Sequence, residues 1–366
     1  MKRKDSKFWM AAALTIAIFA QLAFTQQNQT AAGSTGINAL PVRGNIYMLI
    51  GAGGNVAMSL GRDGVLVVDT GSAQMADKLL ATIQQLSYSV IAAPVAATTC
   101  VGPQCFGVLS QYGWSSPAFN SATVSRTPPK NIRYIINTNI DPDHTGGNAK
   151  IASAGLTFVG GNVTGAIADA GEGAAIIAHD NILVEMTAAN TPARAMPTDT
   201  YHNETYKLSQ FFNGEGVQIV HIPNAHSDGD SVVFFRYSDV LCAGDVYSND
   251  RYPNFDTKRG GSIQGVIDGL NHILEIAIPE FRAQGGTMII PGHGRLADFG
   301  DVAAYRNMVS IVRDRIQDMI KRGMTLEQVK AARPTLDYYG IYGSNTGPWT
   351  TAMFIEAVYR SLTQKP

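Results

Sequence analysis

The chain has 366 residues, of which 45% are hydrophobic and 16% are charged, and its formal net charge is −1 at pH 7. This composition is typical of a globular protein and leaves room for one large domain or two small ones. The nearly neutral charge, with no basic run after the first residues, argues against nucleic acid as a partner.

The N-terminus has the pattern of an export signal. Lysines and an arginine fill most of the first positions, and an apolar run follows over residues 8–20. This run is shorter than the roughly 20 residues that span a membrane. We therefore expect a signal peptide at residues 1–25, a polar linker at 26–40, and a periplasmic or secreted mature protein without stable membrane insertion. An uncleaved membrane anchor is the alternative.

An exported chain meets an oxidising compartment, where cysteines pair. Cys100 and Cys105 flank a Gly-Pro turn, and we expect a disulfide between them in that compartment. Cys242 lies in an apolar segment and is predicted to be a small buried side chain. None of the three has the spacing of a zinc finger.

Short apolar runs broken by Gly and Asp predict strands early in the chain, at residues 45–51, 55–61 and 64–71. Residues 72–87 have helical spacing, with Ser72 as the expected N-cap. Residues 88–130 are rich in Ala, Pro, Ser and Thr and are predicted to be an inserted loop. We then expect a strand, a polar loop and a short helix, at residues 132–138, 139–147 and 148–154.

The second half of the chain has a similar pattern of predicted strands and helices. Apolar runs predict further strands at residues 204–209, 216–222, 231–237, 240–246 and 286–294. Helical spacing is found over residues 262–277 and 301–323, and a shorter helix with Thr325 as its cap is expected over 325–332. Two strand-rich halves, each closed by helices, predict an α/β protein with two sheets packed face to face and helices outside.

Potential metal ligands follow several of the predicted strands. The stretch NTNIDPDHTGGN places four of them in one loop, namely Asn139, Asp141, Asp143 and His144. His226, Asp245 and His293 each lie at the end of a later strand. Loops at strand ends commonly carry functional side chains, and carboxylates and imidazoles bind zinc, iron and manganese. The set therefore predicts a metal centre.

Five of these segments together resemble the metallo-β-lactamase fold superfamily of hydrolases. In chain order they read GVLVVDTG, DPDHTGGN, AHSDGDSVVF, LCAGDVY and IIPGHG. The resemblance covers about residues 44–300. It implies a four-layer αββα sandwich with a metal centre at one edge. The family-like domain is expected at residues 41–300, with C-terminal helices over 301–366 packing on the same domain.

The resemblance also implies two neighbouring metal sites. The loop of the family reads His-x-His-x-Asp-His, and its two leading histidines correspond here to Asn139 and Asp141. With His226 these residues make the first site. Amide and carboxylate oxygens are harder donors than imidazole, so the change favours Mn²⁺, Mg²⁺ or Ca²⁺ over zinc, or leaves the site without a metal.

The second site is complete by the same resemblance. Its residues are Asp143, His144, His293 and the bridging carboxylate Asp245. Asp69, in VVDTG, corresponds to a carboxylate that orients the loop. Two nitrogens and two carboxylates suit zinc or iron. We therefore expect one tightly bound Zn²⁺, with Fe or Mn as alternatives, and an altered site beside it.

Such a centre predicts an exported metal-dependent hydrolase of a small molecule. A metal-activated hydroxide would attack an ester, thioester, lactone or amide bond, with β-lactams among the amides. Asp143 is expected to orient the water and accept its proton, and Asn139 to hydrogen-bond the developing oxyanion. Tyr247 and Arg251 are candidates for the substrate cleft, the alternative being an ordinary surface loop.

A second reading belongs to a different class of protein. A degenerate member of the family would bind a ligand or a partner without turning it over. The loss of two histidines motivates this reading, whereas the complete second site favours the enzyme.

Overall fold

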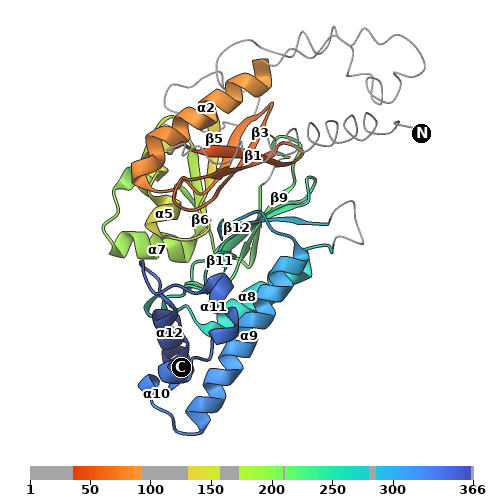
Figure 1. Ribbon diagram of the computed structural model, residues 1–366. Helices are drawn as coiled ribbons and strands as arrows, with labels where there is room; N and C mark the ends of the chain where they lie inside the picture. Colours follow the sequence, from red (N-terminus) through yellow and green to blue (C-terminus); the bar gives the residue numbers. More distant parts are fainter. Residues whose placement is uncertain (1–35, 93–130, 157–172, 209–210, 280–285, 364–366) are drawn as a thin grey trace, which may run out of the picture. The chain divides into compact units, whose positions relative to one another are not determined.

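Two β-sheets form the framework of the protein (Figure 1). The computed structural model describes residues 36–92, 131–156, 173–208, 211–279 and 286–363. The chain from Ile37 onward forms a unit by itself. The predicted signal peptide, and the predicted disulfide between Cys100 and Cys105, lie outside the described residues. No helix in the described part is both long and apolar enough to cross a membrane.

The first sheet has seven strands in chain order. They are β1 (Asn38–Arg43), β2 (Ile46–Ile50), β3 (Val56–Gly61), β4 (Gly64–Val68), β5 (Ile132–Ile136), β6 (Ala175–His179) and β7 (Asp199–Tyr201). Strands β1 to β4 pair antiparallel, and β4 to β7 pair parallel. The parallel strands therefore bring the chain segments after β4 and β5 to the same edge of the sheet.

The second sheet has five strands in the order β12-β11-β10-β9-β8. They are β8 (Thr205–Lys207), β9 (Val217–His221), β10 (Ser231–Phe235), β11 (Val240–Ser248) and β12 (Met288–His293). Only β11 and β12 are parallel. Their carboxyl ends lie together, because parallel neighbours run in the same direction.

Helices connect and cover these strands. They are α2 (Ala76–Ala92), α5 (Pro142–Thr145), α6 (Asn148–Ser153), α7 (Asp180–Ala188), α8 (Ile263–Ile276), α9 (Phe299–Lys321), α10 (Leu326–Ala332), α11 (Tyr339–Tyr342) and α12 (Thr351–Thr363). Thr325 caps α10 in a capping box with Gln328, as the sequence predicts.

The alternation of side chains along the strands produces the layers. In β4, Leu66 and Val68 face the second sheet, where they join one cluster with Val233 and Ile290. Val65 and Val67 point to the other face and pack in a cluster with residues of α2 and α6. The first sheet is therefore covered by helices on one side and by the second sheet on the other (Figure 1).

The outer face of the second sheet packs on the remaining long helices. Leu241 of β11 and Leu270 of α8 share a single buried cluster with Val312 of α9 and Phe354 of α12. The helices after residue 300 thus extend the core of the sandwich. The predicted αββα sandwich with a C-terminal helical extension is confirmed.

Three predicted boundaries are wrong. Strand β1 begins at Asn38, inside the predicted linker. Helix α2 runs to Ala92, so residues 88–92 of the predicted inserted loop are helical, and the rest of that loop up to residue 130 lies outside the described residues. Ser72 precedes a 3₁₀ turn, Ala73–Met75, and its side chain makes no capping hydrogen bond. Local composition placed the start of β1 and the end of α2 wrongly, because sheet pairing and helix packing extend these elements beyond the segments that composition marks.

Candidate metal centre

The predicted ligands come together at one edge of the sandwich, between the two sheets. Asp69 follows β4. Asp143 and His144 lie in α5, which comes after β5 and a short loop. His226 lies in the turn between β9 and β10, while Asp245 and His293 belong to the parallel strands β11 and β12. Segments far apart in the sequence therefore supply one centre.

The second site forms a close cluster. Asp143, His144 and His293 offer ligand atoms that all lie within 4.8 Å of one another. His293 Nε2 is 3.2 Å from Asp143 Oδ2 and 3.5 Å from Asp245 Oδ1. His144 Nε2 lies 3.3 Å from Asp245 Oδ2. Two imidazoles and two carboxylates thus converge on one small volume.

Two polar atoms in this cluster are buried without a hydrogen-bond partner, His144 Nε2 and Asp245 Oδ1. Buried polar atoms in folded proteins nearly always have a partner. An imidazole nitrogen and a carboxylate oxygen in one cluster fit a divalent cation of the zinc class. The second site therefore has the donor chemistry that such a metal needs.

Asp69 fixes the orientation of the His144 ring. Its Oδ2 lies 2.7 Å from His144 Nδ1 and also accepts the hydroxyl of Thr138, while its Oδ1 accepts the backbone N–H of Thr138. The carboxylate is buried. With Nδ1 engaged in this way, Nε2 is the nitrogen that points to Asp245.

Two glycines leave space for these side chains. A Cβ on Gly54 would lie 2.7 Å from the ring of His144. A Cβ on Gly292 would collide with Asp245 Oδ1. Backbone without side chains therefore forms part of the wall of the second site.

The charge state of Asp245 suits a ligand. Burial raises the pKa of its carboxyl, but the imidazoles of His144, His226 and His293 outweigh that effect and hold the pKa below its ordinary value. Asp143 behaves alike: the hydrogen bond from His293 lowers the pKa of its carboxyl. Both groups are anionic at neutral pH, and carboxylates bind metals in that form.

The first site is assembled differently. Asp141 Oδ2 lies 3.1 Å from His226 Nε2, and these two residues form a second ligand cluster with Asp245. His226 Nδ1 lies 2.9 Å from the carbonyl oxygen of Asn254. Asp245 thus lies between the two clusters, which agrees with the bridging position that the resemblance implies.

Arg259 closes this first site, a contact that the sequence pattern does not predict. Its Nη1 donates to Asp141 Oδ1 at 2.7 Å, and its Nη2 lies 3.5 Å from His226 Nε2. Burial raises the pKa of Asp141, but contacts with His226 and Arg259 lower it to about 2. A cation of the protein therefore contacts two of the residues to which the resemblance assigns the first metal. The only sequence signal is an arginine ahead of a Gly pair.

Asn139 serves the backbone of its own loop. The side chain is buried, its Oδ1 accepts the N–H of Asp141 at 2.8 Å, and its Nδ2 donates to Thr138 Oγ1 at 3.4 Å. This Asx-type turn stabilises the loop locally. Its roles as a metal ligand and as an oxyanion contact stay predictions.

The two substrate-cleft candidates differ. Tyr247 is 1% exposed and packs edge-to-face on Tyr305, with ring centroids 5.2 Å apart. This burial contradicts its predicted place in a cleft wall. Arg251 is partly exposed and paired with Asp250, which raises the pKa of its guanidinium, with smaller contributions from Asp245 and Asp143. Arg251 therefore stays a candidate beside the second site.

The comparisons with known proteins agree with this geometry. A family model described as the metallo-beta-lactamase superfamily matches residues 49–293, more than half of the chain. The chain belongs to the metallo-β-lactamase superfamily. No curated protein matches the sequence significantly.

An alkylsulfatase structure resembles the chain in fold, and a metallo-β-lactamase structure matches it with a lower score. The stereoselective inverting sec-alkylsulfatase Pisa1 from Pseudomonas sp. is 14% identical with a TM-score of 0.56, and the match covers 91% of this chain and 53% of that one. This chain therefore spans about half the length of the sulfatase. A metallo-β-lactamase from Pontibacter korlensis is 10% identical with a TM-score of 0.47, covering 75% of this chain and 99% of that one.

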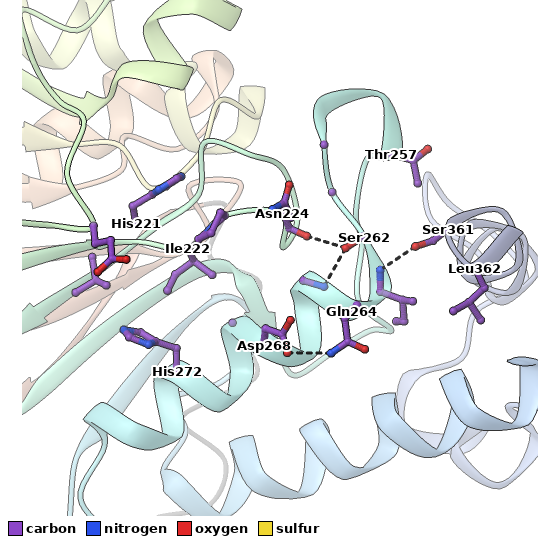
Figure 2. Close-up of a pocket in the computed structure, with 18 of the residues that line it drawn as sticks. His221, Ile222, Asn224, Thr257, Ser262, Gln264, Asp268, His272, Ser361 and Leu362 are labelled. Carbon is purple, nitrogen blue, oxygen red and sulfur yellow. Dashed lines mark hydrogen bonds between the residues drawn. The ribbon is translucent and has the colours of Figure 1, made fainter. Parts of the chain in front are cut away.

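A large cavity lies beside helix α8 and the turn of residues 257–261. It has a volume of about 850 Å³ and is lined by residues of β9, α8 and α12, among them His221, Asp268 and Leu362 (Figure 2). It contains none of the predicted metal ligands. The turn around Gly260 and Gly261 lines this cavity, and Arg259 of the same turn reaches Asp141.

Proposed function

We propose that this protein is a metal-dependent hydrolase of a small molecule, acting on an ester, thioester, lactone or amide bond through the second site. Membership of a hydrolase superfamily and the two clusters of ligand atoms support this proposal. The observation that carries it is the pair of buried, unpartnered atoms, His144 Nε2 and Asp245 Oδ1, between further imidazole and carboxylate groups.

The second site would hold the metal through Asp143, His144, Asp245 and His293. When bound, a divalent metal supplies a water of lowered pKa and a Lewis acid for the substrate oxygen. Zinc fits the two imidazoles, and iron or manganese are alternatives. We expect a single metal, because Arg259 already neutralises Asp141 in the first site.

Asp143 is suited to accept the proton of the attacking water. Its side chain is 39% exposed, whereas that of Asp245 is 7% exposed. The hydrogen bond from His293 keeps its carboxyl anionic at neutral pH. An anionic carboxylate that borders solvent can orient a water and take its proton at a carboxylate oxygen.

His144 and Asp69 act as an oriented pair. The carboxylate of Asp69 holds His144 by Nδ1 and simultaneously holds the start of the metal loop through Thr138. A ligand fixed in this way loses little freedom when a metal binds. The pair therefore preorganises the second site.

A metal analysis followed by a substrate panel tests the proposal. Protein purified without chelator should hold about one tightly bound metal per chain, and a chelator should abolish its hydrolysis until Zn²⁺, Fe²⁺ or Mn²⁺ is restored. The panel contains esters, thioesters, lactones and β-lactams. A secondary alkyl sulfate is included because an alkylsulfatase is among the similar structures. Folded protein without tightly bound metal would contradict the proposal.

A protein that holds the metal but hydrolyses no class of substrate would favour the second candidate, a ligand-binding member without turnover. The replacement of two metal-loop histidines by Asn139 and Asp141 is the observation behind that candidate. The panel and the metal analysis together separate the two.

We also propose that the protein is exported. The basic start followed by a short apolar run supports this. N-terminal sequencing of protein from the native envelope should find a mature start between about residues 20 and 33, the region where small residues follow the apolar run. An intact Met1 on a membrane-embedded product would contradict it.

A further inference from the structure

Arg259 is tied to the first site by several contacts. Its Nη1 lies 2.7 Å from Asp141 Oδ1, its Nη2 lies 3.5 Å from His226 Nε2, and its Nε donates to Asp256 Oδ2 at 3.0 Å. The side chain is 26% exposed, and its Nη1 lies 3.9 Å from Glu185 Oε2. Three of the four side chains in these contacts are carboxylates.

The turn that carries Arg259 is held in place by backbone hydrogen bonds. Asp256 caps the 3₁₀ turn η4 (Thr257–Arg259) by accepting the N–H of Lys258, and its own N–H donates to the carbonyl of His226. The carbonyl of Arg259 accepts the N–H of Asp228 at 2.8 Å. The turn is therefore anchored directly to the segment that supplies His226.

Glycines after Arg259 allow this close approach. Gly260 has φ +85°, a backbone conformation that residues with a side chain rarely adopt. A Cβ on Gly261 would collide with the carbonyl oxygen of His226. The sequence RGG thus permits the turn to lie against the first site, which makes the arginine a built part of that site.

The first site does not fit a metal ion in the way the second site does. Both oxygens of Asp141 are engaged, one by His226 and one by Arg259. The amide oxygen of Asn139 accepts the N–H of Asp141. A divalent cation at Asp141 and His226 would have to displace the guanidinium or lie beside its like charge, and either change opposes binding.

We propose that Arg259 replaces the first metal: its guanidinium balances the charge of Asp141 beside His226, and the chain consequently holds one metal where two-metal members of the fold hold two. This inference rests on the proposed function, because the one metal it leaves is that of the second site. The guanidinium is a fixed cation that needs no metal supply.

The number of zinc ions bound per chain tests the inference. Arg259→Met removes the charge and keeps an unbranched apolar side chain of moderate length, while Arg313→Met is the matched control, since Arg313 is similarly exposed and is paired with Asp314 on helix α9, outside both sites. Isothermal titration with Zn²⁺, checked by mass spectrometry of the native protein, counts the ions. We expect one tight ion in the wild type and in Arg313→Met. In Arg259→Met, a second ion should bind about tenfold or more tightly than in the wild type.

A double-variant cycle assigns the new ion to Asp141. Asp141→Asn removes the carboxylate that Arg259 neutralises, so Arg259→Met should add no zinc in that background. If circular dichroism shows that Arg259→Met does not fold, Arg259→Gln, which keeps a polar side chain, is used in its place. A wild type that binds two zinc ions with equal strength overturns the inference, as does an Arg259 variant that folds and gains no second ion.

The failure of the inference and the failure of the proposed function are distinguishable. If the wild type holds its tight zinc ion and Arg259→Met gains none, the second site stands and the role of Arg259 falls. If the wild type holds no tight ion, the proposed function falls. In that case, a zinc ion gained by Arg259→Met and lost again on Asp141→Asn still supports the role of Arg259.

Discussion

The two ligand clusters of the centre lie side by side and share Asp245, but their polar atoms are satisfied in different ways. In the second site, His144 Nε2 and Asp245 Oδ1 are buried without a partner. In the first site, Asp141 has His226 on one oxygen and Arg259 on the other. One cluster therefore has free ligand capacity, and the other is closed by a cation of the protein.

Under the proposed function, this difference would let a short loop keep one metal site while Arg259 takes the place of the other metal. The second site retains both imidazoles and gains orientation from Asp69. The first site has oxygen donors in place of two imidazoles, and an arginine compensates their charge. Loss of a metal from a centre of carboxylates would otherwise leave a buried anion uncompensated, which is costly.

The largest expected effect belongs to removal of an imidazole from the second site. His293→Ala should strip the tightly bound metal and lower hydrolysis by about 10³-fold or more, since the metal provides both the water and the polarisation of the substrate. His226→Ala makes the same chemical change in the first site and should leave the metal in place. Metal content per folded chain is the measurement. Equal losses in both variants would erase the distinction between the two sites.

A smaller effect is expected when the orienting carboxylate changes. Asp69→Asn should lower metal affinity by about 10–100-fold, because the amide presents a weaker acceptor to His144 Nδ1. Asp69 has φ +64°, a conformation that Asn also tolerates, so the backbone should be little strained. Competition with a chromophoric chelator measures the affinity. Unchanged affinity would show that His144 needs no support from Asp69.

Rebuilding the first site should have a still smaller effect, and it should depend on Arg259. Asn139→His with Asp141→His supplies imidazoles, which zinc prefers to amide and carboxylate oxygens. Zinc uptake should rise toward two ions per chain. Adding Arg259→Met should raise the affinity for the second ion about several-fold further, because it removes one like charge that solvent partly screens. Zinc titrations compare the two variants. No difference between them would mean that the arginine does not oppose a metal there.

The smallest effect concerns a feature remote from both sites. Thr325→Ala removes the capping box of α10, in which Thr325 accepts the N–H of Gln328 and Gln328 accepts the N–H of Thr325. The free energy of unfolding should fall by about 1 kcal/mol. Metal content should be unchanged, and urea denaturation with metal analysis reports both quantities. A loss of metal in this variant would indicate that general destabilisation mimics the site variants.

The candidate ligands could be predicted because they lie in loops at strand ends and because five segments in chain order resemble the metallo-β-lactamase superfamily. Strand β1 could not, since its first four residues are exposed and it contains Pro41, so it lacks an alternating apolar signal. The first-site arginine was missed for a different reason. Arg259 meets Asp141 only through the folded turn at residues 256–261, and no local pattern encodes that contact.

The prediction that Tyr247 lines the substrate cleft failed because strand β11 is irregular. The pairing of β11 with β12 shifts register between Gly244 and Ser248, and Gly244 has φ +51°. Simple alternation therefore fails there, and Val246 and Tyr247 both pack in the core formed with the outer helices. Asp245 meanwhile reaches the metal centre. A sequence pattern cannot show such a shift, because it depends on the neighbouring strand.

The position of bound metal in the wild-type protein is the central question. Anomalous X-ray diffraction from crystals of the zinc-loaded protein, recorded on either side of the zinc absorption edge, locates every zinc ion. We predict a single strong peak surrounded by Asp143, His144, Asp245 and His293, with the contact between Asp141 and Arg259 intact. Two peaks of equal strength, one of them between Asp141 and His226, would contradict the account.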